Sequence, residues 1–320
     1  MKSLVEKPVL DDLDRRLIAA LQCDGRLATE RAARVLGLNT RVVQRRLAAL
    51  LGNGTVRVIA VPPRGNGTTA MLLRIKVLRG KLDTITAALA ARPDIPFIDM
   101  SAGGDEITAV LLADGRRSSL VFRQLPATKA ITSVSAQTVL HVYADATDWR
   151  LDTLTEAERT ELTPPPPNGA PVELDALDRD LADALREDAR VTATALAAAT
   201  GHPESTVRRR LGALLRDRAL VTQVVLDPHA LGLNVDANLY LQIAPAHLEA
   251  AGRALAAHPA VHGVIALTGP ANLSAAVWLR DLEDLHRFIT HDLAPLPVTG
   301  IDTVLVGSAV KRAGQPPGGN

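Results

Sequence analysis

Aromatic residues and cysteine are scarce in this sequence. Aromatics make up 2% of the 320 residues, so buried cores must be built from Leu, Val, Ile and Ala, and a stacking platform for single-stranded nucleic acid is not expected. The single cysteine, Cys23, excludes an intrachain disulfide and a cysteine-rich metal site.

A strong net charge and long apolar runs are also missing. The formal net charge is +1, so any binding to nucleic acid has to come from local basic clusters. The N-terminal residues lack the apolar core of a signal peptide. Pro, Gly and Asn interrupt the uncharged stretch 259–279, which is typical of two strands and a turn and not of a membrane span. We therefore expect a soluble, cytoplasmic protein with no membrane partner.

Signatures of enzymes and metal sites are absent too. The sequence has no Gly-rich phosphate loop, nucleophile elbow or zinc signature. Its eight histidines show no metal-ligand spacing on one helix face and are expected to be surface or core residues: His141, His202, His229, His247, His258, His262, His286 and His291. No cofactor, metal or enzymatic activity is therefore predicted.

The most informative stretch is 37–54, which predicts a helix with a marked start and stop. Asn39 or Thr40 can accept hydrogen bonds from the first backbone N–H groups, and Asn53-Gly54 supplies a left-handed end. An apolar stripe recurs at helical spacing, at Val43, Leu47, Leu50 and Leu51. A shorter helix is predicted over 28–36, and Gly37 separates the two. This arrangement is typical of a helix-turn-helix.

The pattern occurs twice in the chain. Adding 164 to each number lays residues 10–58 on 174–222 without a gap, with 19 identities over 49 positions. A repeat with so long a period indicates two copies of a whole module and not a solenoid.

Each copy continues with a short wing strand and then a segment of changed periodicity. In the first copy, strands are predicted over 71–77, 95–101, 106–113 and 131–142, and helices over 81–91 and 116–125. The order β-α-β-β-α-β is that of a ferredoxin-like domain, and the second copy repeats it between 235 and 310, with helices near 246–257 and 282–293. Helices cover such a sheet on one face only, so its other face must pair with something.

The residues named so far resemble the Lrp/AsnC family, the leucine-responsive and feast/famine transcription regulators. Three short runs are similar to the family's DNA-binding domain: Leu10-Asp11-Asp12-Leu13-Asp14, Asp24-Gly25-Arg26 and Arg45-Arg46-Leu47. The β-α-β-β-α-β units and the turn Thr268-Gly269-Pro270-Ala271-Asn272-Leu273 resemble its effector-binding domain, called RAM. The resemblance implies two protomers joined head to tail, effector domains that pair through their sheets, and amino acids bound between those domains.

The expected fold is therefore α+β, with two winged helix-turn-helix domains alternating with two ferredoxin-like, RAM/ACT-like domains. The predicted segments are a tail (1–9), winged helix-turn-helix 1 (10–61), RAM-like domain 1 (68–143), a proline-rich linker (144–173), winged helix-turn-helix 2 (174–226), RAM-like domain 2 (233–312) and a disordered tail (313–320). Within the linker, Thr155 and Glu158 predict a capping box.

The recognition helices present polar side chains away from their apolar stripes. Arg and Gln at such positions can bond to base edges, and other contacts go to phosphates. The alternative is a solvated helical face. The predicted DNA-binding residues are Thr40, Arg41, Gln44, Arg45 and Arg57 in the first copy and Glu204, Ser205, Arg208 and Arg209 in the second.

Arg46 and Arg210 lie beside the stripe and are expected to pair with an acid of the first helix, such as Asp14 or Asp178, and not with bases. The two copies also differ in charge, because residues 10–60 hold nine Arg and five acids whereas residues 174–224 hold eight of each. The first copy is therefore expected to supply more of the phosphate affinity. Pro203 stands where the first copy has Asn39 and cannot cap through its side chain, so Glu204, Ser205 or His202 is expected to do so.

The resemblance implies an effector site at the glycine turns, where the family brings an acid near the ligand's ammonium group. The candidate residues are Gly103, Gly104, Asp105 and Glu106 in the first copy and Gly269, Ala271 and Asn272 in the second. A neutral Asn272 offers no charge pairing, so the second site is expected to bind a different ligand or none. The alternative is that each turn only joins two strands.

These observations together predict a sequence-specific transcription regulator of double-stranded DNA that reads an imperfect palindrome. Its modulation by a small molecule such as an amino acid, and homo-oligomerisation through the RAM-like domains, follow from the resemblance. Two alternatives stay open: a fused enzyme resembling siroheme decarboxylases, which share this architecture, and a nucleoid-type DNA-binding protein with no effector.

Overall fold

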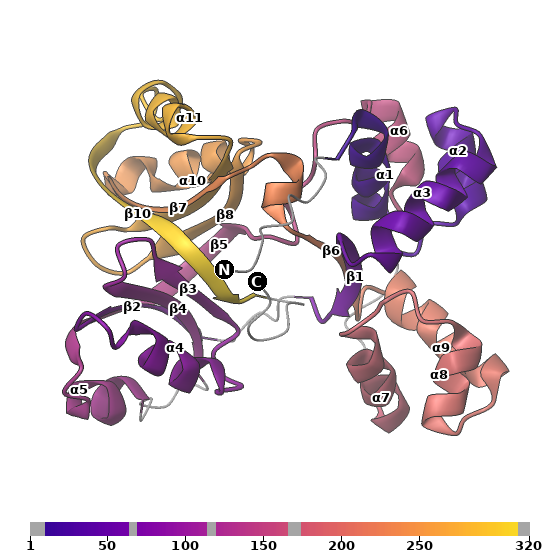
Figure 1. Ribbon diagram of the computed structural model, residues 1–320, viewed down its shortest axis with the longest axis horizontal. Coiled ribbons are helices and arrows are strands. Elements are labelled where there is room, and N and C mark those ends of the chain that lie inside the picture. The colour runs from indigo at the N-terminus through magenta and orange to yellow at the C-terminus, as the bar shows by residue number, and fades with distance from the viewer. Residues whose placement is uncertain (1–9, 64–68, 114–119, 166–173, 313–320) are drawn as a thin grey trace, which may run out of the picture. The chain divides into compact units, whose positions relative to one another are not determined.

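The structure is a computed structural model that describes residues 10–63, 69–113, 120–165 and 174–312 (Figure 1). It divides into two compact units, each assembled from separate segments of the chain. The helical unit contains the described residues up to 65 and from 150 to 232, and the barrel unit contains those from 66 to 149 and from 233 onward. Each unit therefore takes one part from each copy of the sequence repeat.

Several sequence-based expectations fall on residues outside these ranges. They are the tails 1–9 and 313–320, most of the proline run with the Asn168-Gly169 turn, and the start of the helix predicted over 116–125. None of the helices in the described ranges is long and apolar enough to cross a membrane.

The helical unit holds two three-helix bundles, each followed by a strand. The first copy forms α1 (Asp12–Cys23), α2 (Thr29–Leu36), α3 (Thr40–Gly52) and β1 (Val56–Val61). The second copy forms α7 (Ala176–Leu185), α8 (Ala193–Thr200), α9 (Glu204–Arg216) and β6 (Val221–Leu226). The linker adds α6 (Glu156–Leu162) against α1 and α2, and a 3-10 turn, η2 (Pro228–Leu231), follows β6.

Local sequence explains most of these helix ends. The Asn39 side chain accepts a hydrogen bond from the Arg41 N–H, and Thr155 and Glu158 form the predicted capping box. Gly37 and Gly201 end α2 and α8 in the left-handed conformation. The expectation for α9 is wrong, because no side chain caps it. Pro203 occupies the cap position, and its carbonyl instead accepts from the Thr206 and Val207 N–H groups.

The strand after each helix-turn-helix pairs with its counterpart in the other copy. β1 and β6 form a two-stranded antiparallel ribbon with Val56 opposite Leu226 and Val61 opposite Val221. Gly25 lies so close to this ribbon that an added Cβ would be 2.6 Å from Thr222 Cβ. The pairing satisfies the edges of both strands and joins the two bundles.

The two Asp-X-Arg turns interlock beside the ribbon. Arg26 donates to the carbonyls of Ala189 and Val191, and Arg190 donates to those of Gly25 and Leu27. Two arginines that recur in the sequence repeat therefore hold its two copies together.

The barrel unit contains two β-α-β-β-α-β halves. The first half comprises β2 (Thr69–Val77), α4 (Leu82–Ala90), β3 (Phe97–Ser101), β4 (Glu106–Ala113), the π-helix η1 (Leu120–Gln124), α5 (Leu125–Ala127) and β5 (Ile131–Ala144). The second comprises β7 (Val235–Ile243), the 3-10 turn η3 (Pro245–His247), α10 (Leu248–Ala256), β8 (Val261–Leu267), β9 (Leu273–Leu279), α11 (Leu282–Arg287), the π-helix η4 (Phe288–Asp292) and β10 (Val298–Lys311).

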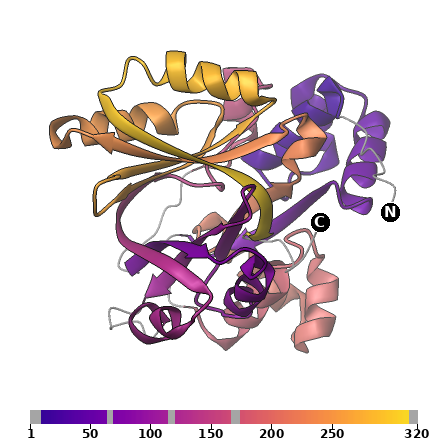
Figure 2. The same ribbon diagram turned by 60° about the vertical axis from the view of Figure 1, so that its left-hand side comes forward.

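The two halves close one barrel with the strand order β10-β3-β4-β2-β5-β8-β9-β7. The long last strand of each half crosses to the other: β5 pairs with β8, and β10 pairs with β3. Figure 2 shows the helices on the outside of the two sheets, whose inner faces meet. A small apolar cluster around Leu72, Tyr240 and Leu267 fills part of the space between the sheets. The expected fold class is confirmed, and the bare face of each sheet pairs with the other half.

Arg218 adopts a left-handed conformation with φ 52°, at the position where the first copy has Gly54 with φ 72°. A residue with a side chain loses roughly 1–2 kcal/mol of stability in this conformation. Glycine avoids that loss, but it has more conformational freedom to lose on folding, so the net gain from glycine is smaller. We expect Arg218→Gly to stabilise the helical unit by about 0.5–1 kcal/mol and Gly54→Arg to destabilise it by a similar amount. Chemical unfolding followed by circular dichroism measures both. A fall in stability for Arg218→Gly would contradict the strain argument.

Candidate nucleic-acid interface

The outward face of α3 carries the predicted polar residues. Val43, Leu47 and Leu50 are buried in the bundle, whereas the other face is exposed. The exposed residues are Thr40, Arg41, Gln44 and Arg45. None of their side chains makes a hydrogen bond or ion pair that involves another described residue. The helix therefore presents the Gln44 amide and the guanidinium groups of Arg41 and Arg45 to solvent.

The second recognition helix, α9, has the same buried stripe but a different outer face. Ser205, Arg208 and Arg209 are exposed, and Glu204 is half-buried. Arg208 pairs with Glu204, which also accepts a hydrogen bond from the Thr194 hydroxyl at 3.0 Å. The hydrogen bond from Arg208 lowers the pKa of Glu204, which keeps the carboxylate ionised at neutral pH. On the outer face of α9 the charge of Arg208 is thus neutralised by Glu204, whereas Arg41 and Arg45 on the outer face of α3 have no acidic partner among the described residues.

Arg46 and Arg210 do not belong to this surface. Arg46 Nη1 lies 2.8 Å from Asp11 Oδ2 and 3.2 Å from Asp14 Oδ2. Arg210 makes the equivalent contacts, with Nη2 2.5 Å from Asp175 and Nη1 3.2 Å from Asp178. The prediction that these arginines pair with acids of the first helix is confirmed. They fix each recognition helix against the first helix of its bundle, α3 against α1 and α9 against α7.

The environment of Asp14 differs from that of Asp11. Burial, and the neighbouring charge of Asp11, raise the pKa of Asp14 despite the Arg46 guanidinium. A backbone hydrogen bond from Asp14 N–H, together with the Arg46 charge, lowers the pKa of Asp11.

Arg57 lies in the ribbon and not on a recognition helix. It is half-buried in β1, opposite Val225 of β6. A role for Arg57 in DNA binding would therefore depend on the ribbon approaching the duplex.

The first glycine turn, between β3 and β4, separates its two candidate acids. Asp105 is exposed, and the Ser101 hydroxyl hydrogen-bonds to its carboxylate at 3.2 Å. Glu106 is buried and receives two hydrogen bonds from Arg74, at 2.5 and 3.1 Å. Only the Asp105 carboxylate is open to a ligand. Gly103 is exposed and Gly104 is left-handed with φ 73°.

The second glycine turn, between β8 and β9, is closed by protein contacts. Asn272 accepts from the Ile243 N–H at 2.9 Å and donates to the Ile243 carbonyl at 2.8 Å. Gln137 from the first half donates to the carbonyls of Thr268 and Ala271. An added Cβ at Gly269 would lie 2.7 Å from the Gln137 amide nitrogen. The polar groups of this turn are used within the barrel unit.

Sequence reasoning missed two features of the structure. Arg26 and Arg190 recur in the repeat, and this recurrence was a signal that they matter, but their partners lie in the opposite copy. A buried polar network around Arg312 was also missed, because its members come from five separate strands or strand ends. Among the described residues no group of three or more His, Cys, Asp or Glu side chains could hold a metal ion.

Known proteins with similar sequences share these segments. The AsnC-type helix-turn-helix domain family matches residues 10–51 and 174–215, and the Lrp/AsnC ligand binding domain family matches residues 238–316. The HTH-type transcriptional regulator AldR of Mycolicibacterium smegmatis is 33% identical over 149 residues, which cover 44% of this chain and 85% of that protein. An uncharacterised HTH-type transcriptional regulator of Pyrococcus horikoshii is 28% identical over 149 residues, covering 46% of this chain and 94% of that protein.

A solved structure matches nearly the whole chain in fold. The siroheme decarboxylase NirDL, in complex with an iron-uroporphyrin III analogue, aligns over 95% of this chain and 93% of its own, with a TM-score of 0.61. The sequence identity is 14%, so the likeness shows a common architecture and nothing about activity.

Proposed function

The chain belongs to the Lrp/AsnC family, and on that premise we propose that it is a sequence-specific DNA-binding transcription regulator. One observation carries the proposal. The outer face of α3 offers Arg41, Gln44 and Arg45 to solvent with no side-chain partner among the described residues, while the neighbouring Arg46 is held by Asp11 and Asp14. Arginine and glutamine so placed can form bidentate bonds to guanine and adenine edges.

The two recognition surfaces favour an imperfect palindrome as the target. Their outer faces differ at three of four aligned positions, because Glu204, Ser205 and Arg208 stand where the first copy has Thr40, Arg41 and Gln44, and only Arg45 recurs, as Arg209. Two unlike readers joined by the β1–β6 ribbon would recognise unlike half-sites, spaced by about one helical turn of roughly 34 Å or a multiple of it.

A titration of labelled duplex with the full chain, followed by fluorescence anisotropy, tests the proposal. The duplex carries the DNA upstream of the protein's own gene, and the competitor is a scrambled duplex of equal length. We expect specific binding that weakens steeply with salt. Binding without discrimination between the duplexes would favour a nucleoid-type protein. No binding to either duplex would reject the proposal.

The fused enzyme is the second candidate, because NirDL shares the fold of nearly the whole chain. Adding siroheme and following its absorbance separates the two functions. A spectral change together with product formation, in a protein that does not bind DNA, would replace the regulator by the enzyme. The exposed basic face of α3 supports the regulator, because arginine and glutamine on a helix can reach base edges and phosphates.

The Glu204–Arg208 pair restrains DNA binding by α9. Replacing Glu204 with Gln removes a charge that repels phosphate and frees Arg208 for contact. We expect Glu204→Gln to increase affinity for scrambled duplex by about 3- to 10-fold and to steepen the salt dependence by about one unit of slope. The matched control is Glu156→Gln at the exposed start of α6, which should change neither value. An unchanged slope for Glu204→Gln would show that Arg208 stays away from phosphate.

A small-molecule effector, such as an amino acid, would bind at the first glycine turn. Asp105 is the exposed carboxylate there, whereas the polar groups of the second turn are occupied by Gln137 and Ile243.

Isothermal titration with individual amino acids should therefore give one ligand per chain. We expect Asp105→Asn to weaken binding by about 10-fold, because an ionic hydrogen bond contributes about 1.5–3 kcal/mol. Asp83→Asn on the exposed face of α4 is the control. Two ligands per chain would contradict this asymmetry.

The proposal also includes association of chains into a homo-oligomer through the barrel unit.

A further inference from the structure

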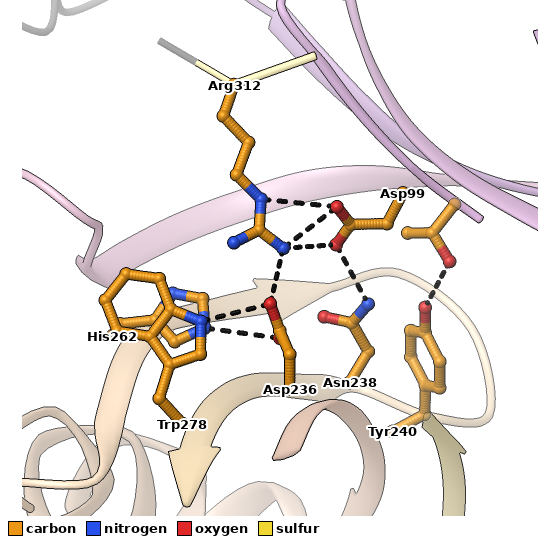
Figure 3. A network of polar contacts seen from close by, with 8 residues as sticks. Asp99, Asp236, Asn238, Tyr240, His262, Trp278 and Arg312 are labelled. Carbon is orange, nitrogen blue, oxygen red and sulfur yellow. Dashed lines mark hydrogen bonds and ion pairs between the residues drawn. The ribbon is translucent and has the colours of Figure 1, made fainter. Parts of the chain in front are cut away.

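A buried polar network joins the two halves of the barrel unit (Figure 3). Asp99 comes from β3 of the first half, whereas Asp236, His262 and Trp278 come from β7, β8 and β9 of the second. Arg312 follows β10 directly and reaches between them. The network therefore lies where the last strand of the second half meets the first half.

Arg312 is shared by two carboxylates. Its Nη2 lies 2.9 and 3.0 Å from the two Asp99 oxygens and 2.7 Å from Asp236 Oδ2. Asn238 donates to Asp99 at 3.4 Å, and the Trp278 indole N–H donates to Asp236 Oδ2 at 3.0 Å. Asp99 is 2% exposed and Arg312 has a side-chain exposure of 14%, so water screens these charges weakly.

One acceptor and one imidazole nitrogen in the network have no hydrogen-bond partner. Asp236 Oδ1 and His262 Nε2 are both buried without one, and they face each other across 3.7 Å, beyond hydrogen-bonding distance. The His262 ring stacks on Trp278 with 3.8 Å between centroids. With a neutral His262, the network holds two negative charges and one positive charge. The buried network therefore carries one negative charge that no cation within it balances.

No neighbouring group in the part of the chain that the structure describes supplies the balancing positive charge. Arg74 from β2 covers the Tyr240 ring, but it already pairs with Glu106 from β4 and Asp302 from β10. The Tyr240 hydroxyl hydrogen-bonds to Thr108. Lys311 points elsewhere and donates to the carbonyls of Ala90 and Arg92 at the end of α4.

We propose that the Asp99–Arg312–Asp236–His262 network is a proton-binding site that ties the fit of the two barrel halves to pH. The proton resides on Asp99. Burial raises the pKa of Asp99 to about 6, against the attraction of Arg312. Burial alone would also raise the pKa of Asp236, but the adjacent His262 imidazole and the Arg312 charge outweigh it and lower that pKa. Burial lowers the pKa of His262, which favours its neutral form.

The sign of the effect on stability follows from proton linkage. Because its pKa is raised on folding, Asp99 binds its proton more tightly in the folded state. The stabilisation is complete below the ordinary aspartate pKa near 4 and is lost as pH rises through about 6. The barrel unit should therefore become less stable between pH 4 and pH 6 as Asp99 ionises.

Intrinsic fluorescence reports this site directly, because both tryptophans of the chain lie at it. Trp149 packs edge-on against Trp278 with 5.0 Å between ring centroids. A pH titration of the full chain should show a one-proton change in emission with a midpoint near pH 6. Asp99→Asn should abolish this change. Asp236→Asn should shift the midpoint to lower pH, because it removes a negative charge that raises the pKa of Asp99. His262→Gln should retain a transition.

Two outcomes would overturn the proposal. One is a transition that survives Asp99→Asn, and the other is the absence of any one-proton change near pH 6 in the unmodified protein. Carboxyl ¹³C NMR of the unmodified protein gives an independent reading if a variant folds poorly. The Asp99 carboxyl should titrate near pH 6, and an Asp99 resonance that is ionised throughout pH 5–8 would also reject the site.

Discussion

Charge reversal of Arg45 to Glu should weaken binding of the specific duplex by roughly 100-fold or more, whereas the same change at Arg209 should cost clearly less. A bidentate arginine–base contact contributes about 1–3 kcal/mol of discrimination, and the introduced carboxylate adds repulsion from phosphate. Arg45 belongs to the copy with nine arginines and five acids, and its helix has no internal ion pair on the outer face. Arg209 lies beside the Glu204–Arg208 pair in the copy with equal numbers of each.

The measurement is the anisotropy titration repeated over a salt series for each variant. The slope of log affinity against log salt should fall more for Arg45→Glu than for Arg209→Glu. Arg186→Glu, on an exposed arginine at the end of α7, controls for the change in net charge. Equal losses and equal slopes for the two recognition-helix variants would refute the asymmetry, while the DNA-binding function itself would stand.

Replacement of Arg210 by Met should destabilise the second helix-turn-helix by about 3–5 kcal/mol, the usual cost of leaving a buried charge without its partner. The Asp178 side chain is 3% exposed, and Arg210 is its ion-pair partner. Asp178 Oδ1 and Arg210 Nε already lack hydrogen-bond partners, so the variant would leave Asp178 with little compensation. The equivalent change at Arg46 should cost less, since Asp14 is 13% exposed and can be reached by water.

Urea unfolding followed by circular dichroism measures both variants, and hydrogen exchange locates the loss in α7 to α9. The double variant Asp178→Asn with Arg210→Met should recover part of the stability, because it removes the uncompensated charge. Arg186→Met on the exposed face of α7 is the matched single control. A double variant no more stable than Arg210→Met would indicate that Arg210 acts through packing and not through charge.

Short-range rules account for the elements that the sequence predicts correctly. Asn39 caps α3 because its side chain reaches an N–H only two residues away, and the Thr155–Glu158 capping box is equally local. The stripe at Val43, Leu47 and Leu50 is buried because helical periodicity gathers apolar side chains on one face. The pairing of Arg46 with Asp14 was also predictable, since a three-helix bundle brings these two helices together. The cap of α9 was predicted wrongly, because Pro203 leaves the first turn to a backbone contact.

The candidate site residues also divide into those that local periodicity predicts and those that only contacts in the folded chain identify. Thr40, Arg41, Gln44 and Arg45 could be assigned to an outer face from periodicity alone, and the structure exposes them. The sequence offered Asp105 and Glu106 as equal candidates at the first turn. Only the cross-strand contact between Glu106 and Arg74 distinguishes them, and it joins residues of two different strands.

The amino-acid sequence was sufficient to show that two copies of one module are present, that each begins with a helix-turn-helix, and that each continues as β-α-β-β-α-β. The elements follow from the periodicity of neighbouring residues, and the two copies follow from identities at a fixed offset, so neither conclusion needs the spatial arrangement. The three-dimensional structure was needed to show that corresponding domains of the two copies pack together. In the helical unit they meet through the β1–β6 ribbon and the contacts of Arg26 and Arg190. In the barrel unit they meet through the exchange of β5 and β10. Strand partners and buried charges such as Asp99 and Arg312 are set by which surfaces meet in space, and residues more than two hundred positions apart leave no local pattern that predicts their meeting.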